Sequence, residues 1–139
     1  TELVPAVARI PAVRSWLLGA QRAAAEDGRL VADGRDMGTV VFPQAWAKVF
    51  LQADLGERAR RRLGDKGIHD PTPADVEAEA ERLSERDRQD AGREVAPLRK
   101  PPGALVVDTT DLSFQEQVDR IAAYAREVAR RPRPPAVDA

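Results

Sequence analysis

Apolar residues near the start of the chain recur at three- and four-residue steps, which is the spacing of one face of a helix. A helix is therefore expected over residues 12–27. Pro11 fits its first turn, where the missing N–H of proline costs nothing, and Gly28 fits its stop. Residues 3–10 are expected to be the end of an earlier helix. The apolar stripe of the 12–27 helix consists of Val13, Trp16, Leu17, Ala20 and Ala24.

Three short apolar runs predict strands, at residues 29–32, 47–51 and 104–107. The 47–51 run, AKVFL, is expected to be buried. Residues 39–42 are apolar and β-branched, and their pattern fits either a strand or simply extended chain. Because the strands alternate with helices, they predict an α/β fold with a parallel sheet and helices on both faces.

The second half of the chain carries three helix signals. Asp54 suits the cap of a helix that begins near residue 55. Thr72, followed by Pro73 and Asp75, indicates a second start. That helix should run to about residue 89 with a thin apolar line, and a helix this polar fits either a solvated arm or a mobile lid. The apolar line of this helix consists of Val76, Ala80 and Leu83.

Ser113 and Glu116 form a capping box before the last helix. Thr109 and Thr110 are expected to shape the loop that precedes it, and residues 132–139 to form a disordered tail. Trp16 and Trp46 are expected to be core or half-buried aromatic residues. The apolar face of the last helix consists of Val118, Ile121, Ala122, Ala125, Val128 and Ala129.

Composition narrows the class of protein. The 139 residues, 42% hydrophobic and 32% charged, can form one globular domain with its own core. The net charge of -1 gives no bulk attraction for nucleic acid or membranes, and aromatic residues, at 4%, are too few for an arginine-rich RNA binder. There is no cysteine, and His69 alone cannot form a metal cluster. No apolar run approaches ~20 residues and no signal peptide precedes Thr1, so the cytoplasm is the expected location.

The charged turn Asp33-Gly34-Arg35-Asp36 follows the first predicted strand and precedes an apolar run. In an open α/β sheet, ligands bind at the carboxyl ends of strands. A bidentate arginine suits a phosphate, and a carboxylate suits an amine or hydroxyl donor. Taken alone, this turn is explained equally well by Arg35 bridging the flanking acids.

The segment GRDMGTVVFP is followed in order by KVFLQA, ERARRR, ERDRQD, REVAPL and ALVVDTTDLS. Together these segments closely resemble the bacterial cytidylate kinases, which phosphorylate CMP and dCMP. The resemblance runs from about Leu3 to about Arg131. It implies a P-loop nucleoside monophosphate kinase fold, with a three-layer parallel sheet, flanking helices and a helical lid. The strand, Gly-rich phosphate loop and helix with which the family begins have no counterpart in these residues, so the fold is expected to be incomplete.

The resemblance also implies roles at the acceptor site. Arg14 is similar to an arginine that contacts cytosine, and Asp36 to its partner at the base. Arg35 is similar to a phosphate ligand. Asp90 is expected to reach the ribose, and the family commonly has a base-reading serine where this chain has Pro5. Cytosine recognition here is therefore expected to depend more on the arginine and the aspartate.

Catalysis and ATP binding are assigned on the same basis. The ERDxxDxxR pattern supplies Arg86 and Arg93, which are expected to bind phosphate, and Arg93 also belongs to the substrate site. The residues expected to act in catalysis are Arg35, Arg86 and Arg93. Arg61 is similar to a lid arginine near the ATP adenine. Arg58 is likewise expected to bind ATP. No metal ligand is assigned within these residues, because magnesium would be held mainly by the absent segment and the nucleotide.

Without the resemblance, the charged clusters have simpler explanations. ERARRR is more typical of a solvated helix face, and pairing of Arg86 with Asp90 four residues later explains ERDRQDAGR. Packing of Arg14 over Trp16 or beside an acid is as good an interpretation as ligand contact. The order and spacing of all these clusters together favour the functional interpretation.

The sequence therefore predicts a (d)CMP kinase that uses ATP and magnesium and binds no nucleic acid polymer. It is expected to be a monomeric kinase, either alone or paired with its absent N-terminal segment. The 139 residues alone are expected to be inactive without a phosphate loop. The alternative is a non-catalytic CMP-binding or interaction module derived from such a kinase. The expected segments are the end of the monophosphate-binding part and a core helix (1–27), core strands and the acceptor turn (28–57), an arginine-rich lid (58–93), a core strand and C-terminal helix (94–131), and a tail (132–139).

Overall fold

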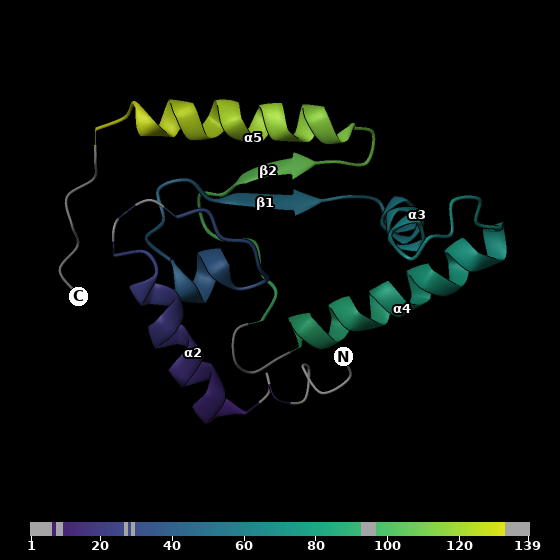
Figure 1. Cartoon of the computed structure of the whole chain (residues 1–139), viewed down its shortest axis with the longest axis horizontal. Coiled ribbons are helices and arrows are strands. Elements are labelled where there is room, and N and C mark those ends of the chain that lie inside the picture. The colour runs from purple at the N-terminus through teal and green to yellow at the C-terminus, as the bar shows by residue number, and fades with distance from the viewer. Residues whose placement is uncertain (1–6, 8–9, 27, 29, 93–96, 133–139) are drawn as a thin grey trace.

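The computed structural model describes residues 7, 10–26, 28, 30–92 and 97–132 (Figure 1). Within these residues, two strands form a parallel sheet, with Val49 of the first opposite Leu105 of the second. In Figure 1 both strands point toward helix α3, and α5 runs back along the side of β2. The elements are α2 (Pro11–Ala23), η1 (Met37–Val41), β1 (Val49–Gln52), α3 (Leu55–Asp65), α4 (Pro73–Ala91), β2 (Leu105–Asp108) and α5 (Phe114–Ala129).

The helix starts follow the capping chemistry in the sequence. The Asp54 side chain accepts hydrogen bonds from the backbone amides of Gly56 and Glu57 in the first turn of α3. Thr72 and Asp75 form a reciprocal capping box at α4, although the sequence suggested only an N-terminal signal there. Ser113 and Glu116 form the predicted box at α5. Each box satisfies amide groups that the first helical turn leaves without partners.

Two predictions about the segment before β1 were wrong. Residues 30–32 form no strand, and Arg29 lies outside the described residues. Residues 39–42 are neither a strand nor extended, because η1 is a π-helical turn over most of this segment. The carbonyl oxygen of Asp36 accepts from the amides of Val40 and Val41, at 2.9 and 3.2 Å, which curls the chain. A strand also needs a paired neighbour for its amides, and β1 is paired to β2 alone among the described residues.

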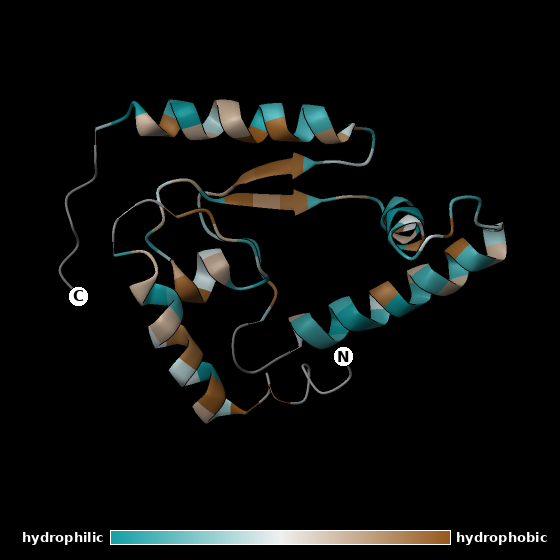
Figure 2. Cartoon of the chain, viewed as in Figure 1, coloured by the Kyte–Doolittle hydropathy of each residue, from teal (hydrophilic) through white to brown (hydrophobic). Residues whose placement is uncertain are grey.

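The α3–α4 hairpin and the sheet hold most of the buried side chains. Ala59 and Leu63 of α3 are buried against α4, and Val107 is buried in β2. Figure 2 shows that the two strands are mainly apolar and that the helices of the hairpin are mainly polar, with scattered apolar residues. No helix in the described part of the chain is long and apolar enough to cross a membrane.

Helix α2 is less buried than its apolar stripe predicts. It begins at Pro11, as expected, but it ends at Ala23, before Gly28 adopts a positive φ of 71°. None of its residues is buried, and Trp16 is 73% exposed. The expectation that both tryptophans are at least half-buried is wrong for Trp16, while Trp46 is 42% exposed.

Candidate functional site

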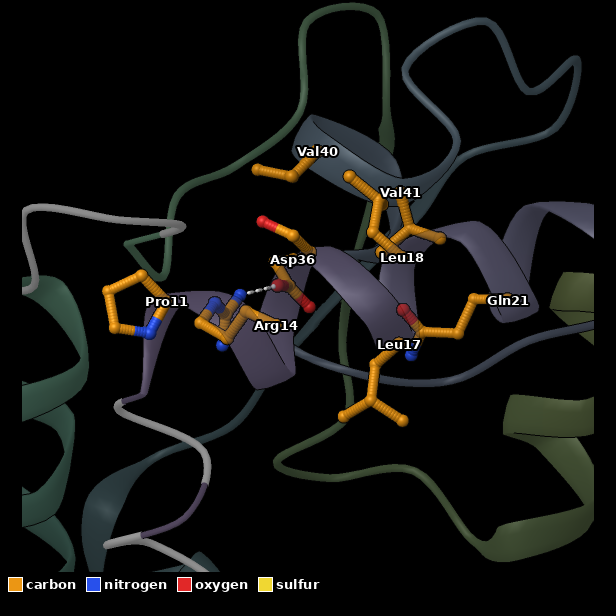
Figure 3. Close-up of a pocket in the computed structure, with 9 residues that line it drawn as sticks. Pro11, Arg14, Leu17, Leu18, Gln21, Asp36, Val40 and Val41 are labelled. Carbon is orange, nitrogen blue, oxygen red and sulfur yellow. Dashed lines mark hydrogen bonds and ion pairs between the residues drawn. The ribbon is translucent and has the colours of Figure 1, made fainter.

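Arg14 and Asp36, which are 22 residues apart in the sequence, meet at a cavity between α2 and η1 (Figure 3). The Nη2 atom of Arg14 lies 2.6 Å from Oδ2 of Asp36, and both side chains are largely shielded from solvent, at 23% and 18% exposed. Arg14 lies in the first helical turn after Pro11, and Asp36 is the residue directly before η1. Each charged residue therefore lies at the N-terminal end of its element, and the two ends face each other.

The cavity has a volume of about 350 Å³. Its wall is mostly aliphatic, and the Arg14–Asp36 pair is its charged part. A small apolar cavity with a few convergent polar groups is typical of a small-molecule site. An ion pair in such a wall offers a donor and an acceptor side by side, which suits a planar heterocycle with both kinds of group. The other lining residues are Pro11, Ser15, Leu17, Leu18, Gln21, Val40 and Val41.

Arg35 points away from this cavity, toward helix α4. It forms an ion pair with Asp90, whose side chain is 3% exposed, and its Nη1 atom lies 3.5 Å from Oδ1 of Asp87. Arg35 therefore bridges two acids of α4. The interpretation in which it bridges the flanking acids of its own turn, Asp33 and Asp36, is not borne out. Consecutive residues of one turn thus contribute to two neighbouring charged groups.

Helix α4 presents these acids because of its periodicity. Asp87 and Asp90 continue, at three- and four-residue steps, the thin line of Val76, Ala80 and Leu83 that faces inward along the helix. The inward face of α4 is therefore mainly apolar as far as Leu83, apart from the buried Glu79, and acidic beyond it. That acidic end lies where the turn supplies Arg35.

Asp87 is shared between two arginines. Arg58 of α3 donates from Nη1 to its Oδ2 at 2.6 Å, and Arg35 approaches its other oxygen. The hydrogen bond from Arg58 is the main cause that lowers the pKa of Asp87 below its usual range, and Arg35 adds to it. Together these contacts outweigh the opposing effect of burial. Asp87 thus stays ionised and links both hairpin helices to the turn.

Arg61 connects the hairpin to the sheet. Its Nε atom lies 2.9 Å from Oε1 of Glu57, and its two Nη atoms donate to the hydroxyl and the carbonyl oxygen of Thr109, at 3.0 and 2.5 Å. Thr109 is buried in the loop directly after β2. In the same loop, the hydroxyl of Thr110 donates a hydrogen bond to the carboxylate of Asp108. Both threonines shape this loop, as predicted from the sequence.

A second, larger cavity of about 580 Å³ lies beside the turn. Its wall is mainly apolar and includes Phe50 of β1 and Ile121 of α5, while Arg35 and Lys48 contribute charge. Arg35 therefore stands between the acidic face of α4 and an apolar space. Among the described residues, no three His, Cys, Asp or Glu side chains are grouped closely enough to hold a metal ion.

A model of the cytidylate kinase family matches residues 1–127 of this sequence. The chain belongs to the cytidylate kinase family. The cytidylate kinase of Geobacillus kaustophilus (strain HTA426) is 47% identical over 127 residues, which cover 91% of this chain and 56% of that protein. The cytidylate kinase of Maridesulfovibrio salexigens is 48% identical over 118 residues, which cover 83% of this chain and 51% of that protein.

A third cytidylate kinase, from Streptococcus pneumoniae (strain Hungary19A-6), is 43% identical over 130 residues, which cover 91% of this chain and 56% of that protein. The chain therefore spans about half the length of the curated relatives it matches. The resemblance to this family inferred from the sequence motifs is confirmed. The mixed helices and small parallel sheet are consistent with part of a P-loop kinase fold.

The structure places the residues that the family motifs single out in separate groups. Arg35 and Asp90 are in contact, and Arg86 lies 4.0 Å from Asp90 in the i, i+4 arrangement, with its side chain 61% exposed. Arg58 joins this group through Asp87. The Arg14–Asp36 pair forms a separate cluster across the turn, and Arg61 lies at the end of the sheet. Pro5 and Arg93 lie outside the described residues.

Sequence reasoning missed two residues of the site. Asp87 could have been found from its spacing, because it lies four residues after Leu83 and three before Asp90 on the inward face of α4. Arg22 donates to two carbonyl oxygens of η1, at 2.9 and 3.1 Å. It had no comparable signal, because the helical form of residues 37–41 was not predicted.

Proposed function

We propose that the protein is an ATP-dependent nucleoside monophosphate kinase that converts CMP or dCMP to CDP or dCDP. In this proposal the present chain supplies the acceptor site and, in the α3–α4 hairpin, a lid. The observation that carries the proposal is the division of the turn: Asp36 faces a cavity with Arg14, while Arg35 faces the charged end of α4. Family membership supports the reaction class, since the matched relatives are named cytidylate kinases.

The Arg14–Asp36 pair is suited to cytosine. The N4 amine of cytosine is a donor that the Asp36 carboxylate accepts, while Arg14 donates to the ring acceptors. Uracil has a carbonyl oxygen in place of that amine, so it would face a carboxylate and leave it without a donor. A site built on such polar contacts rejects the mismatched base far more strongly than an apolar pocket does.

Arg35, Arg86 and Arg93 are proposed to bind the phosphate, and Asp90 the ribose. The ion pairs of Arg35 with the α4 acids keep its guanidinium beside the proposed ribose ligand. A nucleotide phosphate would compete with these carboxylates for the same donors, so binding would rearrange the turn and α4 together. Phosphoryl transfer depends mainly on such positioning and charge neutralisation, with no nucleophile required from the protein.

The hairpin is proposed to close over the phosphates and exclude water. Arg58 and Arg61 lie on α3 and are proposed to serve the ATP side of the site. Magnesium, when bound, would neutralise phosphate charge, and no residue of this chain is assigned as its ligand. The sequence given contains no G-x-x-x-x-G-K-[ST] phosphate loop, so these 139 residues are proposed not to transfer phosphate by themselves.

Calorimetry and a coupled ADP-release assay test this proposal on the 139-residue chain. The chain is expected to bind CMP, to bind UMP more weakly, and to release no ADP from ATP, CMP and magnesium. Full turnover would contradict the proposed dependence on a phosphate loop, and failure to bind CMP would contradict the acceptor site. Activity restored by an added segment that carries a phosphate loop would support the kinase, whereas CMP binding that stays unproductive would favour the non-catalytic module.

A further inference from the structure

Helix α2 contacts both ends of η1. At the N-terminal end, Arg14 forms its 2.6 Å ion pair with Asp36. About two helical turns further along α2, Arg22 donates from Nη2 to the carbonyl oxygen of Val40 at 2.9 Å and from Nε to that of Val41 at 3.1 Å. One helix therefore holds both ends of the short element that begins after Asp36.

The C-terminal end of η1 needs donors from elsewhere. Within η1 the carbonyl oxygen of Asp36 accepts from several amides, and Phe42 donates to Met37 at 2.7 Å. The last carbonyl groups of a helical turn have no amide partners inside the turn. Val41 is only 3% exposed and its bond from Arg22 is part-buried, so water has limited access to replace a lost donor there, whereas the bond to Val40 is exposed. Arg22 fills this need for two successive carbonyl oxygens.

The chemistry of arginine fits this position closely. A guanidinium group holds its donors in a rigid planar fork, so it can serve two neighbouring carbonyl oxygens at once. Lysine carries a single rotatable ammonium group and cannot reproduce that arrangement. A five-residue π-helical turn is also a rare element that occurs often at functional sites, and a fixed clamp at one end restricts where its other end lies.

We propose that Arg22 is a positioning residue for the pyrimidine site: by holding the end of η1 it keeps Asp36 opposite Arg14 at the cavity. This inference rests on the proposed function, because it takes that cavity as the place where cytosine binds. Arg22 would not touch the nucleotide. Its effect on base selectivity would pass through the backbone of η1.

Two substitutions and one control test the inference. Arg22→Gln removes the fork, and Arg22→Lys keeps the charge without the paired donors. Arg126→Gln makes the same chemical change at an exposed position of α5. All three are compared with the unmodified 139-residue chain.

The first readout needs no ligand. Nuclear magnetic resonance would follow the guanidinium protons of Arg14, which the ion pair with Asp36 should slow in exchange, and the amide of Phe42 at the end of η1. In Arg22→Gln we expect both to exchange about tenfold faster or more, as the loss of one or two hydrogen bonds implies. Arg22→Lys should lie between, and Arg126→Gln should match the unmodified chain.

The second readout is the ratio of CMP to UMP affinity, measured by calorimetry. Arg22→Gln should lower CMP affinity about tenfold, the equivalent of roughly one hydrogen bond, and leave UMP affinity almost unchanged. A residue that only stabilises the fold would alter the unfolding midpoint without changing this ratio.

The outcomes separate this inference from the proposed function. Unchanged exchange in Arg22→Gln overturns the inference whether or not CMP binds. Faster exchange with an unchanged CMP to UMP ratio also overturns it, because Arg22 would then support η1 without positioning the base site. If the unmodified chain fails to bind CMP, the proposed function fails, and the Arg14 signals alone decide whether Arg22 holds Asp36 in place.

Discussion

The α3–α4 hairpin and the α2–η1 region are held together by different kinds of contact. In the hairpin, Ala59 is fully buried, Leu63 is 5% exposed, and the carboxylate of Glu79 is covered and paired with Lys66 at 2.7 Å. In the α2–η1 region no residue of α2 is buried. That region is held by a few long-range polar contacts, those of Arg14 and Arg22 with the turn.

This difference in contacts suggests that the hairpin mainly determines stability and that the α2–η1 region mainly determines recognition. Because the hairpin packs against itself, most substitutions in its interior should alter its stability and leave the base site unaffected. The α2–η1 region contributes little buried surface but places Asp36 and Arg35. Substitutions there should alter recognition more than stability.

Leu63→Ala should destabilise the hairpin by about 2–4 kcal/mol, because it removes a buried side chain and leaves a cavity. Leu17→Ala makes the same change in α2, where the side chain is 40% exposed, and should cost less than about 1 kcal/mol. Urea unfolding followed by circular dichroism would measure both. Equal losses in the two variants would remove the distinction between the regions.

Much of the hairpin could be predicted from the sequence because its signals are local. The cap at Asp54 and the Thr72-Pro73-Asp75 start each act within one helical turn. The proposed strand at residues 29–32 was wrong for the opposite reason. A strand depends on a partner that may be distant in sequence, and short apolar runs do not reveal whether one is present.

The same limit applies to the candidate site. Residue spacing could not predict that Arg14 contacts Asp36. The family resemblance was what singled out both residues. Asp87 lies between arginines on a polar helix, and an acid in that setting usually belongs to a solvated face. Its contacts with Arg35 and Arg58 depend on how the turn and α3 lie against α4.

Asp36→Ala should lower CMP affinity about 10- to 100-fold, the equivalent of losing a charge-assisted hydrogen bond of roughly 1.5–3 kcal/mol. UMP affinity should change less, so the preference for CMP should shrink. Calorimetry would measure both affinities. Asp33→Ala removes an exposed acid from the same turn and serves as the matched control. Unchanged selectivity in Asp36→Ala would mean that the turn has been assigned wrongly.

Glu79→Gln should cost about 1–2 kcal/mol of stability. Glu79 is buried, but Lys66 is 41% exposed, so the cost should be smaller than that of breaking a fully buried ion pair. The hydrogen bond from Lys66, and lesser contacts with Lys66 and Arg82, lower the pKa of Glu79 despite its burial. Glu81→Gln, at an exposed position of α4, is the control.

The pH dependence of this effect has a definite sign. A carboxyl group with a lowered pKa in the folded protein adds stability that is complete above the pKa of the unfolded chain, ~4.3 for glutamate. That stability is lost as the pH falls through the folded pKa. The difference between the unmodified chain and Glu79→Gln should therefore be constant near neutral pH and shrink in acid. A difference that stays constant throughout the acid range would contradict the assigned role of Lys66.

Thr72→Ala should have the smallest effect, about 0.5–1 kcal/mol of stability, as is typical for the loss of an N-cap. Its hydroxyl and backbone amide both donate to Asp75 and hold the pKa of that carboxyl below its usual value, the hydroxyl more strongly. In Thr72→Ala the pKa of Asp75 should rise part of the way back, which nuclear magnetic resonance can follow. Thr72→Ser keeps the hydroxyl and should preserve both properties. Because the cap acts within α4, CMP affinity should stay unchanged; a loss comparable to that in Asp36→Ala would show that the hairpin and the base site are coupled.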